Sequence, residues 1–226
     1  MKRIAEPELM DDPAQVQAYT QADFEQPHSH FMTLLQESFP APLATDPSTR
    51  TYALDLGCGP ADISRRYARA YPDHVVHAVD GAANMLKMAQ QLNQAEGLNA
   101  HIELLHGRIN DICLPRPNYD VIFSNSLLHH LQEPLELWRL LARHVRPGTR
   151  LFVMDLLRPE STQSARHLLD LYAADESEIL RQDFFHSLCA AYSVTEVQQQ
   201  LADSHIDYCH VKQVSDRHLI VYGTTP

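Results

Sequence analysis

From residue 52 onward, short apolar runs alternate with longer segments in which apolar residues recur every three or four positions. We predict β-strands at residues 52–56, 74–79, 100–106, 119–124 and 149–155. We predict helices at residues 61–71, 82–96 and 134–145. Because strands and helices alternate with short connections, the pattern indicates a parallel sheet that is covered by helices on both faces.

The N-terminal part of the chain departs from this alternation. A helix is predicted to begin at Pro13 with Asp12 as its cap, and a second amphipathic helix follows it. The connector at residues 41–50 is rich in Pro, Thr, Ser and Asp. We therefore interpret residues 1–50 as a helical cap or lid, and residues 51–226 as the main domain.

The C-terminal part departs from it as well. Residues 158–192 look helical, which gives a predicted helical insertion at about residues 156–193. A helix at residues 195–203 comes next, and strands at 208–213 and 218–223 then follow each other directly. The chain is predicted to be α/β and Rossmann-like: a seven-stranded, mostly parallel sheet with an antiparallel C-terminal hairpin, helices on both faces and a helical N-terminal lid.

The most informative stretch is the decapeptide Tyr-Ala-Leu-Asp-Leu-Gly-Cys-Gly-Pro-Ala. Here a buried strand enters a tight turn at Gly57-Cys58-Gly59, where a backbone without β-carbons can bend with positive φ and lie against a ligand. Asp55 can accept hydrogen bonds from that ligand. A dinucleotide fingerprint needs a third glycine three residues after Gly59. That position is Asp62, whose carboxylate would face a pyrophosphate, so the stretch favours a cofactor without phosphates.

This turn resembles the first motif of class I methyltransferases that depend on S-adenosyl-L-methionine (SAM). In that family a third glycine often stands where this chain has Ala61. Five parallel strands followed by an antiparallel pair also match the architecture of the family. The resemblance implies that SAM is the cofactor and S-adenosyl-L-homocysteine (SAH) the product. It also implies that Asp55, Gly57, Cys58 and Gly59 contact the cofactor.

The loop after the second strand carries the next predicted contacts. Asp80 stands at the strand end, about 25 residues beyond the first acid, and can hold both ribose hydroxyls. Gly81 permits the turn, and Met85 can lie against the adenine. The alternative for Asp80 is that it only caps the following helix.

The loop after the third strand departs from the family pattern. The family commonly has an Asp directly after the glycine of this loop, where this chain has Arg108. Arg108, Ile109 and Asn110 are nevertheless predicted to bind the cofactor. The contact to the adenine amino group falls to Asn110 or Asp111, and an ordinary turn is the alternative.

After the fourth strand the chain reads Ser-Asn-Ser-Leu-Leu-His-His-Leu. This resembles a segment of small-molecule methyltransferases related to the ubiquinone and menaquinone enzymes. The resemblance implies that Asn125 and Ser126 meet the methionine portion of SAM, with Asn125 also a candidate for substrate binding. His129 is a candidate general base, as is His130, since the ordinary histidine pKa is about 6.5. His129 is also a candidate for substrate binding. Packing beneath the cofactor is the alternative.

The remaining candidates concern the methyl acceptor. Asp155, a catalytic candidate, and Arg158 follow the fifth strand, and Arg158 can clamp a substrate carboxylate unless it pairs with Asp155 or with the insertion. Tyr19 and Phe24 of the lid are expected to point into the acceptor cavity, and Tyr19 is a further catalytic candidate. Three aromatic residues of the insertion either wall this cavity or pack in the core: Phe184, Phe185 and Tyr192.

Composition narrows the partners. The chain has 226 residues and a formal net charge of −11, and its 18 basic residues form no run, which disfavours nucleic acid and anionic membranes. No apolar run approaches the length of a membrane span. The 4 cysteines and 14 histidines show no metal-binding spacing, so no metal is expected. We expect a cytoplasmic enzyme with a small-molecule substrate and without nucleic-acid or membrane partners; its oligomeric state does not follow from the sequence.

These features predict SAM-dependent methyl transfer, an SN2 displacement, to a small polar metabolite. The chain is also similar to methyltransferase domains of the ovothiol pathway, which methylate an imidazole nitrogen of thiohistidine. An imidazole or amine nitrogen, such as that of 5-thiohistidine, is therefore a candidate acceptor. Two alternatives stay open: transfer of another alkyl group from a SAM analogue in the same pocket, and a non-catalytic SAM-binding partner protein.

Overall fold

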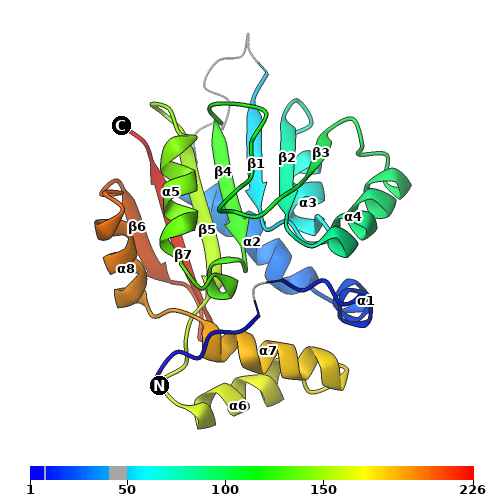
Figure 1. Ribbon diagram of the computed structural model, residues 1–226, viewed down its shortest axis with the longest axis vertical. Helices are drawn as coiled ribbons and strands as arrows, with labels where there is room; N and C mark the ends of the chain where they lie inside the picture. Colours follow the sequence, from blue (N-terminus) through cyan, green and yellow to red (C-terminus); the bar gives the residue numbers. More distant parts are fainter. Residues whose placement is uncertain (8, 41–49) are drawn as a thin grey trace.

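The computed structural model describes residues 1–7, 9–40 and 50–226. Its central element is a seven-stranded sheet with the strand order β3-β2-β1-β4-β5-β7-β6 (Figure 1). The strands are β1 (Tyr52–Leu56), β2 (Val75–Asp80), β3 (Ile102–His106), β4 (Val121–Asn125), β5 (Arg150–Leu156), β6 (Cys209–Gln213) and β7 (His218–Thr224). Strands β1 to β5 are parallel, and β7 lies antiparallel between β5 and β6. This arrangement confirms the predicted Rossmann-like sheet and its C-terminal hairpin.

Helices surround this sheet. They are α1 (Pro13–Gln21), α2 (Glu25–Ser38), α3 (Asp62–Ala70), α4 (Ala83–Ala95), α5 (Leu135–Arg143), α6 (Thr162–Tyr172), α7 (Glu178–Ala190) and α8 (Val194–Asp203), with the short 3-10 turn η1 (Leu128–His130). The long helix expected at residues 158–192 is two helices. The chain turns after α6, and the Ser177 hydroxyl accepts a hydrogen bond from the backbone N–H of Leu180, which caps α7.

Each face of the sheet has its own apolar core. On one face α5 and α8 pack over the strands and bury Trp138, and on the other α2 and α3 bury Phe31 and Tyr67. Side chains alternate between the two faces along a strand. Leu54 of β1 therefore joins the first core and Ala53 the second. Strand β1 is thus buried on both sides, as a central parallel strand should be.

The N-terminal helices pack directly against the sheet. Phe31 and Leu35 of α2 are fully buried in the core that α2 shares with α3. The connector that we predicted at residues 41–50 lies, apart from its last residue, outside the described residues. A boundary at residue 50, between a lid and a main domain, therefore stays a prediction.

The strand order reverses beside β1, because β2 and β3 lie on one side of it and β4 and β5 on the other. In open α/β sheets, ligands bind beyond the carboxyl ends of the strands at such a reversal. Helices α6 and α7 lie across this end of the sheet, and the N-terminal segment runs alongside α7 (Figure 1). The backbone N–H of Ile4 donates to the carbonyl of Cys189 at the end of α7, with an N···O distance of 3.0 Å. The N-terminal segment and the two helices thus cover the place where the fold positions a ligand.

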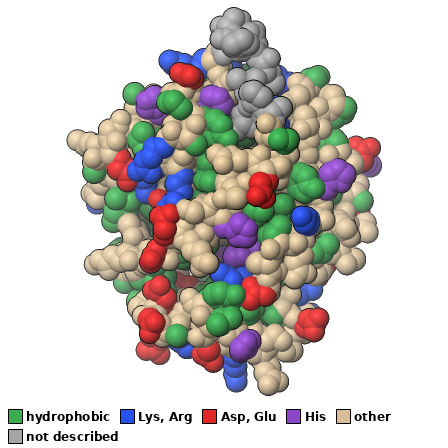
Figure 2. All heavy atoms as spheres, turned by 180° about the vertical axis from the view of Figure 1, so that it is seen from behind, with side chains coloured by type: hydrophobic (Ala, Val, Ile, Leu, Met, Phe, Trp, Pro, Cys, Tyr) green, Lys and Arg blue, Asp and Glu red, His purple; other side chains and the backbone are tan. Residues whose placement is uncertain are grey.

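The surface shows mixed charges. On the face drawn in Figure 2, basic side chains lie in several separate places among acidic and polar ones. Among the described residues, none of the helices has both the length and the apolar character needed to cross a bilayer.

Candidate cofactor and acceptor site

The turn after β1 has the backbone that the glycine pattern predicts. Gly57 and Gly59 adopt φ values of 72° and 52°. Ala61, which stands at the expected position of a third glycine, also has a left-handed conformation, with φ of 62°. The backbone N–H groups of Gly57 and Cys58 both donate to the carbonyl of Val79, each at 2.9 Å, which ties the turn to the end of β2. The turn is therefore bent against the neighbouring strand and presents bare backbone to the space above it.

Asp80 joins the loops after β1 and β2. One carboxylate oxygen accepts from the N–H of Gly59 at 2.7 Å, and the other accepts from the N–H of Ala82 at 2.8 Å. Burial raises the pKa of Asp80, although both backbone N–H groups favour its ionised form. Because a carboxylate oxygen has two acceptor positions, each can still accept from a ribose hydroxyl. Asp80 does not cap α4, because Ala82 is the N-cap of this helix. Its contact with the ribose stays a prediction.

Asp55 lies deeper in the same pocket. Its side chain is buried, and one of its oxygens accepts from the hydroxyl of Ser64 at 2.6 Å. Burial raises the pKa of Asp55 to about 7, with a further contribution from the negative charge of Asp80. Asp55 is therefore a carboxyl group that is poised to ionise near neutral pH when a positive charge approaches.

The loop after β3 closes the other end of this pocket, which we call the cofactor pocket. Arg108, Ile109 and Asn110 all line it, as predicted, and so does Met85 from α4. Asp111 does not line it, because its carboxylate accepts from the N–H of Arg108 at 3.2 Å and stabilises the turn. Of the two candidates for the adenine contact, Asn110 is the one that faces the pocket.

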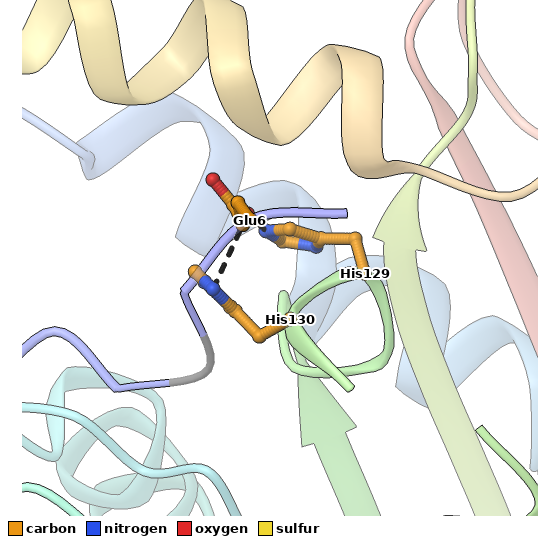
Figure 3. Close-up of side chains that lie close together, drawn as sticks. All are labelled: Glu6, His129 and His130. Atoms are coloured by element: carbon orange, nitrogen blue, oxygen red, sulfur yellow. Dashed lines mark ion pairs between the residues drawn. The ribbon is translucent and has the colours of Figure 1, made fainter. Parts of the chain in front are cut away.

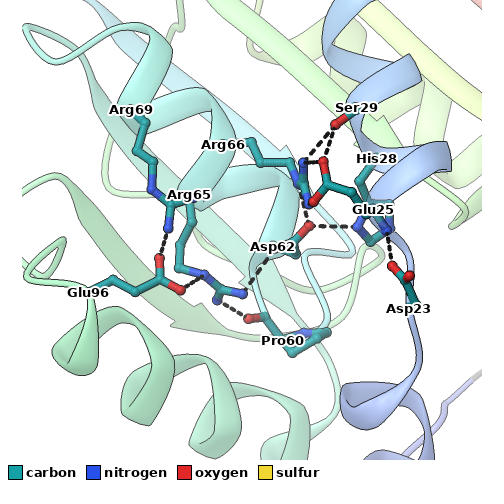
Figure 4. A network of polar contacts seen from close by, with 10 residues as sticks. All are labelled: Asp23, Glu25, His28, Ser29, Pro60, Asp62, Arg65, Arg66, Arg69 and Glu96. Atoms are coloured by element: carbon teal, nitrogen blue, oxygen red, sulfur yellow. Dashed lines mark hydrogen bonds and ion pairs between the residues drawn. The ribbon is translucent and has the colours of Figure 1, made fainter.

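Asp62, at the start of α3, anchors α2 to the rim of the cofactor pocket (Figure 4). It lies 2.7 Å from Nδ1 of His28 and accepts from Nε of Arg66 at 2.6 Å. Arg66 continues to Glu25 of α2, with an N···O distance of 2.7 Å. Burial alone would raise the pKa of Asp62, but the hydrogen bonds from His28 and Arg66 outweigh it and hold that pKa well below its usual range.

Substituting Asp62→Asn is expected to lower the free energy of unfolding by about 1–3 kcal/mol at pH near 7, because Arg66 and His28 lose a charged acceptor. The depressed pKa means that the ionised carboxylate stabilises the folded state above the unfolded-state pKa of about 3.9, and that this contribution is lost as the pH falls. Urea unfolding of the wild type and the variant checks this at neutral and acidic pH. Glu37→Gln, at an exposed position of α2, serves as the control. If Asp62→Asn lost as much free energy of unfolding at acidic pH as at neutral pH, the assignment would be contradicted.

A second cavity, the acceptor chamber, adjoins the cofactor pocket. It extends from the turn between α1 and α2, past η1 and the end of β5, to α7. Four candidates for the acceptor side line it, namely Tyr19, Phe24, Asn125 and His129, and so does Phe184. Ser126, which was predicted to contact the cofactor, lines it as well. The two cavities share six lining residues: Met10, Tyr19, His28, Asn125, Ser126 and His130. Donor and acceptor molecules bound in them would therefore meet at this shared wall.

His129 is held from behind by Asp155. Nδ1 of His129 lies 2.6 Å from one oxygen of Asp155, whose carboxylate also accepts from the N–H groups of Leu128 and Leu156. Burial alone would lower the pKa of His129, but the Asp155 carboxylate raises it. Asp155 itself lines neither cavity. Its place is therefore that of a positioning group for His129 rather than a group that touches the acceptor.

Arg158 does not lie where a substrate clamp was expected. It donates to Glu196 of α8 at 2.9 Å and lines neither cavity. Two of the three wall candidates, Phe185 and Tyr192, also lie elsewhere, and Tyr192 donates its hydroxyl proton to the carbonyl of Leu131. The arginine that does line the acceptor chamber is Arg217, in the turn of the C-terminal hairpin.

Sequence reasoning missed several lining residues that come from distant parts of the chain. His28 of α2 and Met10 of the N-terminal segment line both cavities. Three carboxylates line the acceptor chamber, from the turn between α1 and α2, the turn after α6, and α7: Asp23, Glu176 and Asp183. No local motif marks any of these residues, because each is brought to the chamber by the packing of elements that are far apart in sequence.

The strand order, the glycine turn and the acid at the end of β2 agree with the fold that the sequence resemblance implies. Residues 53–148 match a family model described as a methyltransferase domain. A SAM-dependent methyltransferase from Aquifex aeolicus has a TM-score of 0.68 with 22% sequence identity, and the match covers 95% of this chain and 99% of that one. The plantazolicin methyltransferase BpumL, solved with SAH, has a TM-score of 0.70 with 16% identity, over 95% and 91% of the two chains. At these identities, the structural likeness shows the fold.

Curated relatives point to the same class. An uncharacterized methyltransferase of Mycobacterium tuberculosis is 32% identical over 59% of this chain and 65% of its own length. Phosphoethanolamine N-methyltransferase 1 of Arabidopsis thaliana is 30% identical over 50% of this chain and 22% of its own length. This chain thus spans less than two thirds of the length of the relatives it matches. The family model and these relatives support the predicted class of enzyme.

Proposed function

We propose that this protein is a SAM-dependent methyltransferase that acts on a small polar metabolite. The observation that carries the proposal is the position of Asp80. Its carboxylate fixes the glycine turn through Gly59 and lines a pocket that opens into the acceptor chamber through a shared wall. A cofactor with a ribose fits this pocket, because each oxygen of Asp80 accepts one backbone N–H and keeps a second acceptor position for a hydroxyl. The structural neighbour solved with SAH supports the choice of cofactor.

Bound SAM supplies a methyl group on a positively charged sulfur, which is already a strong electrophile. The acceptor's lone pair forms the new bond to carbon while the sulfur–methyl bond breaks, and that electron pair stays on the sulfur of SAH. The side chains of the shared wall, Asn125 and Tyr19 among them, have to align the two molecules and exclude water. Burial raises the pKa of Tyr19 to about 12, so its hydroxyl keeps its proton and serves as a hydrogen-bond donor.

We propose a nitrogen nucleophile as the acceptor atom, in an imidazole or an amine. The acceptor chamber has a cavity volume of about 330 Å³, at the small end of the range for ligand pockets. Three carboxylates line it, and Oδ2 of Asp183 is buried with no hydrogen-bond partner among the described residues. Such oxygens favour N–H groups and positive charge. Arg217 also lines the chamber, where it pairs with Asp216 at 3.1 Å and lies over the Tyr172 ring. A guanidinium has five N–H donors, so it can also bind a substrate carboxylate, which makes 5-thiohistidine a candidate acceptor.

A methyl-transfer assay tests this proposal. The protein is incubated with SAM and 5-thiohistidine, histidine or a primary amine, and the products are identified by mass spectrometry. We expect a methylated nitrogen and stoichiometric SAH. If SAM or SAH fails to bind in calorimetry, the proposed function is wrong. If SAM binds but is not turned over on any nitrogen acceptor, a non-catalytic binding role or transfer from a SAM analogue replaces it.

The affinity for SAM is expected to rise by up to about tenfold between pH about 6 and pH about 8, because Asp55 ionises as the positive ligand binds. The raised pKa of about 7 means that the free protein carries part of this proton near neutrality and that binding releases it. Calorimetry in two buffers of different ionisation enthalpy measures the proton release. The pKa of Asp80 is raised as well, so either carboxyl group can release the proton. The variant Asp55→Asn separates the two contributions. Proton release that persists in Asp55→Asn would assign the effect to another group.

A further inference from the structure

Glu6, His129 and His130 form a compact cluster at the edge of the acceptor chamber (Figure 3). His129 and His130 are neighbours in η1, and Glu6 reaches them from the N-terminal segment, which passes between η1 and α7. The three side chains are largely shielded from solvent, with exposed fractions of 10% for Glu6, 3% for His129 and 17% for His130. Two imidazoles and a carboxylate are thus brought together with little exposure to solvent.

The distances in the cluster match the edges of a coordination polyhedron. Oε1 of Glu6 lies 3.2 Å from Nδ1 of His130 and 3.6 Å from Nε2 of His129. Bonds of about 2.0–2.1 Å to a tetrahedral metal ion place its ligand atoms about 3.3–3.4 Å apart. Although Nδ1 of His130 is buried, it makes no hydrogen bond of good geometry among the described residues. Its proximity to Glu6 without such a bond is the arrangement expected of two lone pairs directed at a common centre.

The neighbours of the cluster orient the ligand atoms. Asp155 lies 2.6 Å from Nδ1 of His129, which fixes the ring and directs Nε2 toward Glu6. The hydroxyl of Ser187 donates to both oxygens of Glu6, at 3.1 and 3.3 Å. A carboxylate behind a histidine and a hydrogen bond to a carboxylate ligand are the usual supports of metal ligands in proteins.

We propose that Glu6, His129 and His130 bind one divalent transition-metal ion, of the class of Zn²⁺ or Fe²⁺, beside the acceptor chamber. Two histidines and one carboxylate suit ions of intermediate softness, and three protein ligands leave coordination positions open. Both histidines line the chamber, so an open position can take a heteroatom of the acceptor. This role rests on the proposed function, whereas the binding of the ion does not depend on it. The ion would lower the pKa of the acceptor heteroatom and hold it near the shared wall.

Metal binding by the full chain tests the proposal. The purified protein is stripped with a chelator, dialysed, and titrated with Zn²⁺ in a calorimeter and with Co²⁺ in a visible-absorption cell. We expect one ion per chain and the absorption of a Co²⁺ site with fewer than six ligands. Glu6→Gln and His130→Asn should each lower the affinity by at least about tenfold. Thermal melting of each variant shows whether it is folded.

His167→Asn is the matched control, because His167 is exposed on α6, lines neither cavity and does not belong to the cluster. Its metal affinity should equal that of the wild type. The absence of metal uptake by the wild type, or an undiminished stoichiometric site in folded Glu6→Gln, would overturn the proposal. SAH binding to the metal-free protein is measured alongside. If the protein binds SAH but takes up no ion, only this inference is wrong. If it takes up the ion but does not bind SAH, only the proposed function is wrong.

Discussion

Replacing Asp80 by asparagine is expected to weaken SAH binding by about 10- to 100-fold. Asp80 accepts hydrogen bonds from the N–H groups of Gly59 and Ala82, one on each oxygen. An asparagine presents an NH₂ group to one of these two N–H groups, so one of the two loops loses its hydrogen-bond acceptor. The ribose loses a charged acceptor at the same time. A hydrogen bond to a charged group contributes about 1.5–3 kcal/mol, and 1.4 kcal/mol is a tenfold change in affinity. Calorimetry with SAH measures the effect.

The control for this variant is Asp73→Asn. Asp73 is exposed in the turn before β2, and its substitution makes the same change in net charge. If long-range attraction between the acidic protein and the ligand governed binding, both variants would weaken it equally. We expect only Asp80→Asn to do so. A folded Asp80→Asn protein that binds SAH within about threefold of the wild type would remove Asp80 from the cofactor site.

The residues that the sequence assigns to the cofactor line one pocket, and the reason is local. In a parallel sheet, every loop that follows a strand at the reversal of strand order reaches the same edge. Asp80 and Asn125 are the last residues of their strands, and Gly57 and Ile109 follow theirs within three residues, so the place of each residue along the chain already decides its place in the fold. Placing these residues from the sequence therefore required no knowledge of where the helices end or of how the side chains pack.

The acceptor half does not follow from the sequence, because packing between distant segments builds it. Arg158 shows how a local rule fails. Residue 157 pairs with Tyr192 in an isolated bridge, and the N–H of Arg158 donates to the carbonyl of Tyr192. This pairing carries the Arg158 side chain to Glu196 of α8, away from the chamber. The chamber receives Arg217 instead, from a hairpin turn almost sixty residues later.

The cluster of Glu6 with the two histidines was also outside the reach of the sequence. A pair of adjacent histidines has no metal-binding spacing, and no pattern connects it with a glutamate more than 120 residues earlier. The link is the N-terminal segment. Arg3 donates to the carbonyls of His129, Leu131 and Ala190, which fixes the segment across η1 and α7 and thereby sets the position of Glu6.

Substituting Gly57→Ala is expected to destabilise the fold and to weaken SAH binding together. A β-carbon at Gly57 would lie 2.8 Å from Cδ1 and 2.9 Å from Cβ of Leu127, so the turn or the loop after β4 has to move. The left-handed conformation costs a non-glycine residue about 1–2 kcal/mol, and overpacking adds about 1–3 kcal/mol. Because Leu127 adjoins Asn125 and Ser126 of the shared wall, the displacement reaches the place where the two molecules meet. Urea unfolding and SAH calorimetry measure the two effects.

Gly97→Ala separates the steric part of this effect from the conformational part. Gly97, just after α4, has φ of 70°, close to the 72° of Gly57, but a β-carbon there would have no atom within 4 Å. Both variants carry the same conformational cost, so the difference between their free energies of unfolding is the cost of the contact with Leu127. We expect Gly97→Ala to lose about 1–2 kcal/mol and to bind SAH like the wild type. Equal losses in both variants, with SAH affinity intact, would mean that Leu127 yields freely and that the turn does not depend on close packing against the loop after β4.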